Sequence, residues 1–189
     1  MQKEEDVCKA LNIYCLILID FQERLIKHIE EANQILKNSS KIIRACKVFG
    51  IPILITEQKK LGNSVKEIRN LIDVKPIQKL SFSCMKCEEF YEKIKEINPE
   101  KCILVGIETH ICILQTALDM LKEGYEVYVV LDCIGSRNLN DKEVAIQRMV
   151  SEGVKPVTSE TMIYEIMRTA KHEKFKEILQ IIKEQGVKR

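Results

Sequence analysis

Apolar residues along the chain alternate between short continuous runs and longer stretches with helical spacing. Continuous runs, which predict strands, cover residues 13–20, 51–56, 101–106, 126–132 and 155–158. Helical spacing predicts helices over residues 31–49, 64–71, 83–97, 111–123, 141–152, 160–167 and 172–185. Strands that are apolar throughout and alternate with helices are typical of a parallel sheet covered on both faces. The pattern therefore predicts a three-layer α/β/α fold with a central, mainly parallel sheet.

Turn residues delimit several of these elements. Gly50, Gly124 and Gly153 each follow a predicted helix, where glycine is a common stop. Ser64 stands at the start of the short helix, and we expect its side chain to cap that helix. Residues 76–79 follow in a less regular region.

Length and composition indicate one domain without a nucleic-acid or membrane partner. The 189 residues are 46% hydrophobic, which is enough for one sizeable core, and nothing in the sequence divides them. The 30 basic and 28 acidic residues give a net charge of +2 and form no long run of one sign. The longest apolar run, residues 13–19, is too short to cross a bilayer, so we expect a cytoplasmic protein.

Four of the eight cysteines follow the apolar pattern. Cys15, Cys102 and Cys133 lie in or next to strand-like runs, and Cys46 lies in a helical pattern. Cysteine at such positions behaves as a small hydrophobic residue. We therefore expect these four side chains to be buried packing residues.

The carboxyl ends of the predicted strands carry chemically active residues, and open parallel sheets bind their ligands at these ends. Asp20 follows the first strand, Lys79 ends the less regular region, and Cys112 stands in the first turn of the helix after residues 101–106. A nearby ammonium and a helix N-terminus lower the pKa of a thiol, and a carboxylate can accept its proton. The three residues therefore predict a cysteine nucleophile, although each alone has an ordinary structural explanation. A Cys–His pair involving His110 is favoured less.

Cys84 and Cys87 form a CxxC pair at the start of a predicted helix. This arrangement occurs in thioredoxin-like redox sites and in one half of many zinc sites. No second CxxC or CxxH pattern in the sequence completes a zinc site. Two explanations stay open, namely incidental structural thiols and reversible disulfide regulation.

Several motifs together resemble the isochorismatase-like cysteine hydrolases, the superfamily that includes nicotinamidases. They are Leu18-Ile19-Asp20-Phe21-Gln22, Thr56-Glu57-Gln58, Lys79-Leu80-Ser81-Phe82-Ser83 and Gly106-Ile107-Glu108-Thr109-His110-Ile111-Cys112. The resemblance spans roughly residues 13–166 of a single domain, 1–189, with a further C-terminal helix at 172–185. It implies the Rossmann-like fold of that superfamily.

The resemblance also implies roles for particular residues. Asp20, Lys79 and Cys112 match a catalytic triad, and the bond between Ile107 and Glu108 matches a cis peptide. By the same resemblance, the N–H groups of Glu108 and Cys112 form an oxyanion hole, and catalysis passes through a thioester. The expected substrate pocket draws on Phe21, Gln22, Phe82, His110 and Ile111.

The chain also departs from the better-known branches of this superfamily. Nicotinamidases place an Asp and several His residues after the second strand to hold a divalent metal, whereas residues 56–62 here contain no histidine. We therefore expect no metal and no cofactor. Thr56-Glu57-Gln58 is most similar to a branch whose substrates are unassigned. The family resemblance further implies a small-molecule substrate and a homo-oligomer, either a dimer or a larger ring.

Three functions stay open at this point. The first is cysteine-dependent hydrolysis of a small molecule at an amide or related C–N bond, and the second is isochorismate-type ether hydrolysis without a cysteine nucleophile. The third is a non-enzymatic or redox interaction protein that uses Cys84 and Cys87. Isochorismatases that cleave a vinyl ether lack the nucleophilic cysteine, so the presence of Cys112 favours the first.

Overall fold

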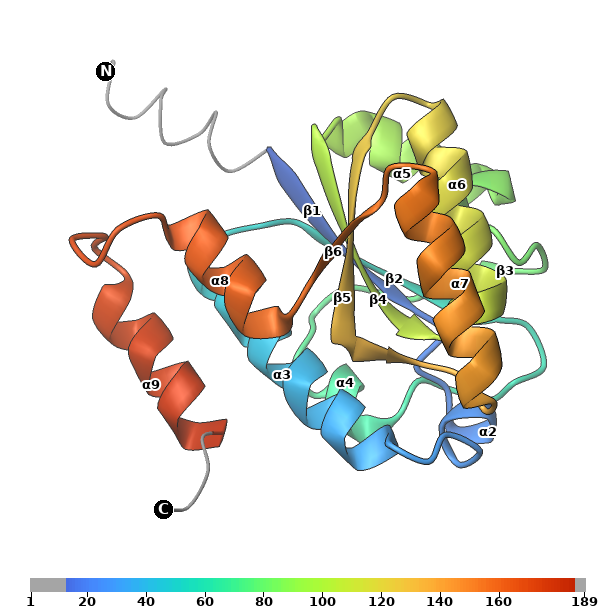
Figure 1. The fold of residues 1–189 in the computed structure, drawn as a ribbon, viewed down its shortest axis with the longest axis horizontal. Coiled ribbons are helices and arrows are strands. Elements are labelled where there is room, and N and C mark those ends of the chain that lie inside the picture. Colours follow the sequence, from blue (N-terminus) through green and yellow to red (C-terminus); the bar gives the residue numbers. More distant parts are fainter. Residues whose placement is uncertain (1–12, 186–189) are drawn as a thin grey trace.

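A computed structural model of the chain describes residues 13–185, which form a six-stranded sheet with helices on both faces (Figure 1). The strands are β1 (Tyr14–Ile19), β2 (Ile53–Gln58), β3 (Ile77–Lys79), β4 (Lys101–Ile107), β5 (Glu126–Gly135) and β6 (Lys155–Val157). Their order is β3-β2-β1-β4-β5-β6, and each neighbouring pair is parallel. The predicted three-layer α/β/α fold is confirmed.

Helices cover the two faces of the sheet in two separate groups. The helices are α2 (Glu23–Ile26), α3 (Ala32–Phe49), α4 (Lys66–Arg69), α5 (Glu88–Ile97), α6 (Leu114–Lys122), α7 (Leu139–Ser151), α8 (Ser159–Met167) and α9 (Phe175–Gln185). Two single turns, η1 (Cys84–Lys86) and η2 (Thr109–Ile113), precede α5 and α6. Figure 1 shows α3, α8 and α9 on one face and α5, α6 and α7 on the other. Within residues 13–185, no helix has the length and apolar content needed to cross a bilayer.

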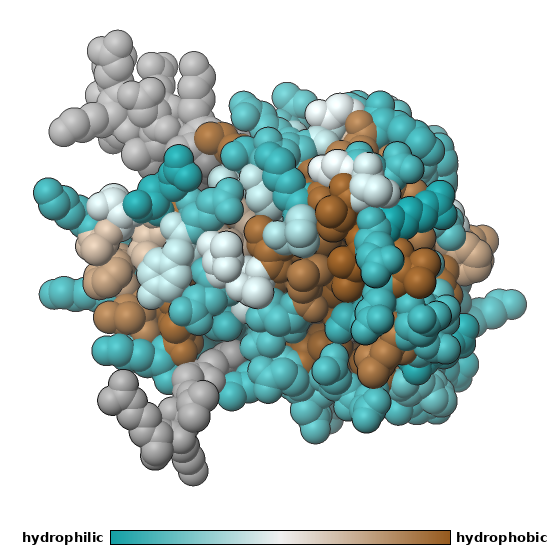
Figure 2. All heavy atoms as spheres, in the orientation of Figure 1, coloured by the Kyte–Doolittle hydropathy of each residue, from teal (hydrophilic) through white to brown (hydrophobic). Residues whose placement is uncertain are grey.

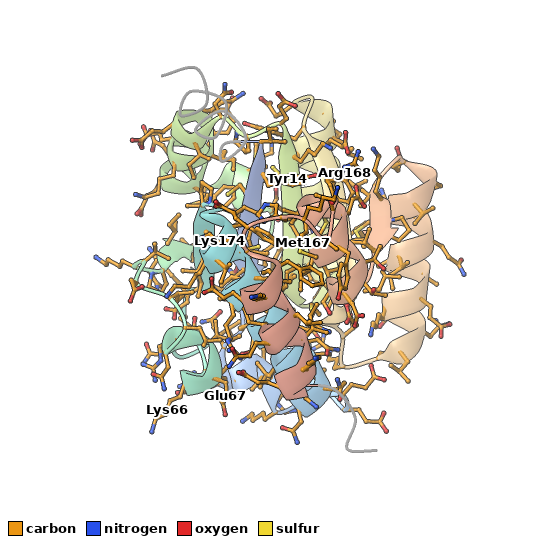
Figure 3. All side chains as sticks on the ribbon, turned by 90° about the vertical axis from the view of Figure 1, so that its left-hand side faces the viewer. Tyr14, Lys66, Glu67, Met167, Arg168 and Lys174 are labelled. Carbon is orange, nitrogen blue, oxygen red and sulfur yellow. The ribbon has the colours of Figure 1, made fainter. Side chains whose placement is uncertain are left out.

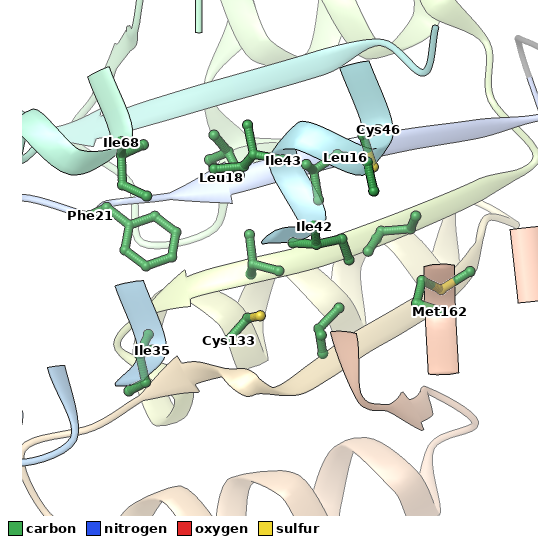
Figure 4. Packing of buried hydrophobic residues seen from close by; sticks show 14 of the residues in the cluster. Leu16, Leu18, Phe21, Ile35, Ile42, Ile43, Cys46, Ile68, Cys133 and Met162 are labelled. Atoms are coloured by element: carbon green, nitrogen blue, oxygen red, sulfur yellow. The ribbon is translucent and has the colours of Figure 1, made fainter. Parts of the chain in front are cut away.

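The central strand β1 divides the hydrophobic core into two clusters. Leu16 and Leu18 pack with Ile42 and Ile43 of α3 on one face (Figure 4). Ile17 belongs to the cluster on the other face, together with residues of α5, α6 and α7. Successive side chains of a strand point to opposite faces, so a continuously apolar strand supplies both clusters at once.

The four cysteines that follow the apolar pattern are fully buried, as predicted. Cys15 and Cys102 lie in one core cluster, and Cys46 and Cys133 lie in the other. Burial disfavours the charged thiolate, and it raises the pKa of Cys46 and of Cys102 to about 12. These thiols therefore act as packing residues.

Some local predictions were wrong. Residues 77–79 form strand β3 at the edge of the sheet, although the sequence pattern there is too short to indicate a strand. Ser64 does not cap a helix, because α4 begins later and its N-cap residue is Val65. The Ser64 hydroxyl instead donates a hydrogen bond to Glu57 Oε1 at 2.7 Å.

Gly106 allows β4 to lie against the end of β1. Its φ angle is +136°, a value that residues with a side chain rarely adopt, and it pairs with Ile19. A Cβ atom at this position would lie 2.0 Å from the backbone oxygen of Ile19. The β4–β5 register also shifts between Leu104 and Gly106, so the strand bends where it leads toward Cys112.

We predict that Gly106→Ala lowers the free energy of unfolding by more than about 4 kcal/mol, because the methyl group collides with backbone that cannot move alone. Gly124→Ala is the matched control. Gly124 also has a positive φ, +87°, but a Cβ atom there meets nothing within 4 Å, so the expected loss is about 1–2 kcal/mol. Urea denaturation measures both values, and equal losses would contradict this account.

Candidate active site

Asp20 lies directly after β1, at the carboxyl end of the central strand. Its φ angle is +53°, in the left-handed region that aspartate tolerates better than most residues. The side chain is completely buried. Its Oδ1 atom accepts a hydrogen bond from the Thr56 hydroxyl at 2.9 Å, and its backbone N–H donates to the Thr56 carbonyl at 3.2 Å. The neighbouring strand β2 therefore fixes the carboxylate in place.

Lys79 reaches the same point from the edge strand β3. Its Nζ atom lies 2.7 Å from Asp20 Oδ2, and neither side chain is exposed to solvent. Nζ also donates to Gln58 Oε1 at 2.8 Å and to Cys112 Sγ at 3.6 Å. Backbone oxygens of Ser81 and Phe82 lie 3.3 Å and 3.2 Å from Nζ. The ammonium group is thus enclosed by acceptors.

The charge of Lys79 depends on these neighbours. Burial lowers the pKa of Lys79, but the carboxylate of Asp20, with smaller contributions from the thiols of Cys84 and Cys112, raises it more. The net shift of the Lys79 pKa is upward, so the lysine stays protonated beside Asp20.

Cys112 lies in the π-helical turn η2, between β4 and α6, and 6% of its surface is exposed. Burial and the carboxylate of Asp20 raise its pKa, and the Lys79 ammonium lowers it by less. The pKa expected from the sequence, lowered by the ammonium and the helix end, is therefore wrong for the resting protein. The thiol has the Asp20 carboxylate as well as the Lys79 ammonium as a neighbour, and both of these side chains are closed off from water.

The segment between β4 and η2 turns sharply. The peptide bond between Ile107 and Glu108 is cis. The Glu108 carbonyl accepts hydrogen bonds from the N–H groups of Ile111 and Ile113, at 3.2 Å and 3.3 Å. The buried Glu108 carboxylate accepts a hydrogen bond from the Arg137 backbone N–H at 3.2 Å. The oxyanion hole assigned to the Glu108 and Cys112 N–H groups stays a prediction.

Two of the residues expected in the substrate pocket are fully buried and make structural contacts, and their part in the pocket stays a prediction. Phe21 is fully buried and packs in the hydrophobic cluster with Leu18 and Ile68 (Figure 4). The Gln22 side chain is also fully buried, and it donates to the carbonyls of Gln58 and Gly62 at 3.0 Å and 2.6 Å. Its Oε1 atom accepts a hydrogen bond from the Gln58 N–H at 2.8 Å. Gln22 therefore uses its amide group to hold the loop after β2.

The other three expected pocket residues are accessible to different extents. Phe82 is 53% exposed, and it directly follows Ser81, whose carbonyl lies near Lys79. His110 and Ile111, which belong to η2, are partly buried. The His110 Nδ1 atom lies 2.9 Å from the Ser136 hydroxyl. Their part in substrate binding stays a prediction.

Thr56 and Gln58 contact the cluster directly, although the sequence analysis predicts no role for either beyond membership of a motif. They are two residues apart on β2, so their side chains share one face of the strand. Glu57, between them, points the other way and accepts hydrogen bonds from Ser64 and Gln78. The period-two spacing at a strand end is the signal that could have identified both residues.

The two cysteines of the CxxC pair lie in different surroundings, and both are free thiols. Cys84 is fully buried, and its Sγ atom lies 3.8 Å from the Thr56 hydroxyl. Burial and the carboxylate of Asp20 raise the pKa of Cys84 to about 11. Cys87 is partly buried, and its Sγ atom lies 3.8 Å from the Gln78 carbonyl.

A cavity of about 850 Å³ lies at the opposite end of the strands from the Asp20–Lys79–Cys112 cluster. Tyr14, at the start of β1, lines it together with Arg168 and Lys174 (Figure 3). None of its lining residues belongs to the cluster. In the part of the chain that the structure describes, no three His, Cys, Asp or Glu side chains come together in a way that could hold a metal ion.

Comparison with known proteins identifies the family of this chain. The isochorismatase domain family matches residues 14–161. The isochorismatase domain-containing protein 2 of Xenopus laevis is 39% identical over 173 residues, which cover 89% of this chain and 83% of that protein. The chain thus matches the family over most of its length.

Solved structures share the fold. The structure of MAR1 ribonuclease from Caenorhabditis elegans has a TM-score of 0.85 and 34% sequence identity, and the match covers 91% of this chain and 90% of that one. The YcaC protein of Escherichia coli, described as an octameric hydrolase of unknown specificity, has a TM-score of 0.81 at 21% identity, with 93% and 96% covered. On the sequence matches and the shared fold, the chain belongs to the isochorismatase family of hydrolases.

Proposed function

We propose that this chain is a cysteine-dependent hydrolase that cleaves an amide or related C–N bond of a small molecule through a thioester on Cys112. One observation carries the proposal: Lys79 Nζ lies 2.7 Å from Asp20 Oδ2 and 3.6 Å from Cys112 Sγ in a closed cluster. A thiol, a carboxylate and an ammonium at these distances supply a nucleophile, a base and a counter-charge. The proposed steps need no metal ion and no cofactor.

The first half of the reaction forms the thioester. Asp20 accepts the proton of Cys112 Sγ as the sulfur attacks the carbonyl carbon, and the carbonyl π electrons move onto the oxygen. In this proposal the N–H groups of Glu108 and Cys112 donate to that oxyanion. When the intermediate collapses, the C–N bond breaks and Asp20 gives its proton to the leaving nitrogen.

The second half releases the acid. Asp20 takes a proton from a water molecule as the water oxygen attacks the thioester carbon. Collapse of this intermediate breaks the C–S bond, and the proton returns from Asp20 to the sulfur. A carboxylic acid leaves, and the thiol, carboxylate and ammonium are restored. Lys79 keeps its charge throughout, in accordance with the upward shift of its pKa.

The enclosure of the cluster supports a small substrate. Cys112 is 6% exposed, and the Asp20 and Lys79 side chains are not exposed at all. The name of the C. elegans relative raises RNA cleavage as a second candidate. A closed site in a chain of net charge +2 favours a small molecule over a polynucleotide. Assaying an RNA oligonucleotide beside small amides and esters tests this choice.

We also propose that the chain forms a homo-oligomer. Figure 2 shows apolar side chains gathered over the side of the molecule where α7 lies, and Leu139, Val144 and Val150 of α7 are 50%, 55% and 44% exposed. Patches of this kind often mark an interface between subunits. The octameric E. coli relative supports the same proposal. Light scattering of the purified protein measures the assembly directly.

We predict that Cys112→Ala lowers the rate of hydrolysis of small amides and of an activated ester such as p-nitrophenyl acetate by at least about a thousandfold. Cys87→Ser is the matched control, because this thiol lies outside the Asp20–Lys79–Cys112 cluster and its Sγ atom lies 3.8 Å from the Gln78 carbonyl. An unchanged rate in Cys112→Ala would favour ether hydrolysis without a cysteine nucleophile. Loss of the rate in Cys87→Ser would favour a redox role for the CxxC pair.

Lys79 also stabilises the fold, and we predict that Lys79→Met lowers the free energy of unfolding by about 3–5 kcal/mol. The substitution leaves the Asp20 carboxylate buried without its counter-charge. Adding Asp20→Asn to Lys79→Met removes that charge and should recover more than half of the loss. Urea denaturation measures the single and double variants, and a single variant as stable as the wild type would contradict the account.

A further inference from the structure

Strand β2 ends beside the Asp20–Lys79–Cys112 cluster and sends two side chains into it. Thr56 is fully buried and contacts Asp20, whereas Gln58 is partly buried and contacts Lys79. Glu57 lies between them on the opposite face of the strand, where it contacts Ser64. The end of this one strand therefore touches both charged members of the cluster.

Each oxygen of the Asp20 carboxylate has its own donor, and one of the two donors is the Thr56 hydroxyl. Thr56 Oγ1 donates to Oδ1 at 2.9 Å, and Lys79 Nζ donates to Oδ2 at 2.7 Å. A carboxylate only accepts hydrogen bonds, so the Thr56 proton points at Asp20. The Cys84 thiol donates to the same hydroxyl oxygen, with its Sγ atom 3.8 Å away. The two hydrogen bonds to Asp20 fix the plane of its carboxylate.

The Gln58 amide orients the ammonium of Lys79 in a similar way. Gln58 Oε1 accepts from Nζ at 2.8 Å, and the other end of the amide donates to the Leu80 carbonyl at 2.8 Å. An ammonium has three protons, and the two shortest contacts of Nζ are those with Asp20 and Gln58. The remaining acceptors near Nζ are the carbonyl oxygens of Phe82 and Ser81, at 3.2 Å and 3.3 Å, and Cys112 Sγ at 3.6 Å.

We propose that Thr56 and Gln58 are positioning residues for the reaction: Thr56 holds the Asp20 carboxylate in place, and Gln58 holds the Lys79 ammonium beside the Cys112 sulfur. This inference rests on the proposed function. The titratable groups that face Asp20 are Lys79 from β3, Cys112 from η2 and Cys84 from η1. Thr56 contributes a neutral donor among them, so replacing it changes no charge.

The test is the rate of Cys112 alkylation by iodoacetamide from pH 4 to pH 9, followed by mass spectrometry of the Cys112 peptide. In the wild type the rate should rise with pH, because Asp20 accepts the thiol proton only as a carboxylate. Asp20→Asn removes this acceptor and should change the profile. Thr56→Val should move the midpoint of the rise up by about 1 pH unit, because the ionised carboxylate loses a donor. Thr56→Ser should restore the wild-type midpoint. Gln58→Met should lower the plateau rate roughly tenfold.

Glu57→Gln is the matched control, because Glu57 lies on the same strand but contacts no member of the cluster. It should lower the melting temperature without moving the midpoint. A wild-type midpoint in Thr56→Val, or an equal shift in Glu57→Gln, would overturn the inference and leave the proposed function standing. A wild-type profile in Asp20→Asn would instead overturn the proposed function.

Discussion

The buried ion pair between Asp20 and Lys79 is the interaction on which the rest of the site depends. Removing two charges from water costs several kcal/mol for each ion, and only close contact with further hydrogen bonds offsets this cost. The pair has both, since Lys79 Nζ lies 2.7 Å from Asp20 Oδ2. Thr56 donates a further hydrogen bond to Asp20, and Gln58 accepts one from Lys79. Cys112 completes the cluster as a neutral thiol with a raised pKa. A proton that moves from Cys112 to Asp20 keeps the net charge of this closed cluster constant, whereas a proton lost to solvent does not.

The fold brings these groups together at the carboxyl ends of the strands of a parallel sheet. Asp20 follows the central strand β1, Lys79 ends the edge strand β3, and Cys112 follows β4 on the other side of β1. From β1 the chain adds β2 and β3 on one side and then crosses to add β4, β5 and β6 on the other side. Open α/β sheets bind ligands at such topological switch points. Gly106 allows β4 to lie against Ile19 there, because a Cβ atom would collide with the Ile19 backbone. The site thus depends on backbone contacts as much as on its side chains.

Much of this arrangement could be predicted from the sequence, and the limits have physical causes. Continuous apolar runs identify β1, β4 and β5 because those strands are buried on both faces. The edge strand β3 has only three residues, too few for a recognisable pattern. The positions of Asp20, Lys79 and Cys112 at predicted strand ends suggest a shared site, but no sequence pattern reports the burial that raises the Cys112 pKa. Phe21 and Gln22 follow a strand end as pocket residues do, yet packing and loop hydrogen bonds occupy both side chains.

The central claim is that the Cys112 sulfur becomes covalently bonded to the acyl group of the substrate. Rapid mixing with a substrate found in the amide and ester panel, acid quenching, and mass spectrometry of the digested protein test this claim most directly. The account predicts a mass increase equal to the acyl group on the Cys112 peptide, sensitive to hydroxylamine and formed together with a burst of the leaving group. Steady hydrolysis without any adduct on that peptide, at the same rate in Cys112→Ala, would contradict it.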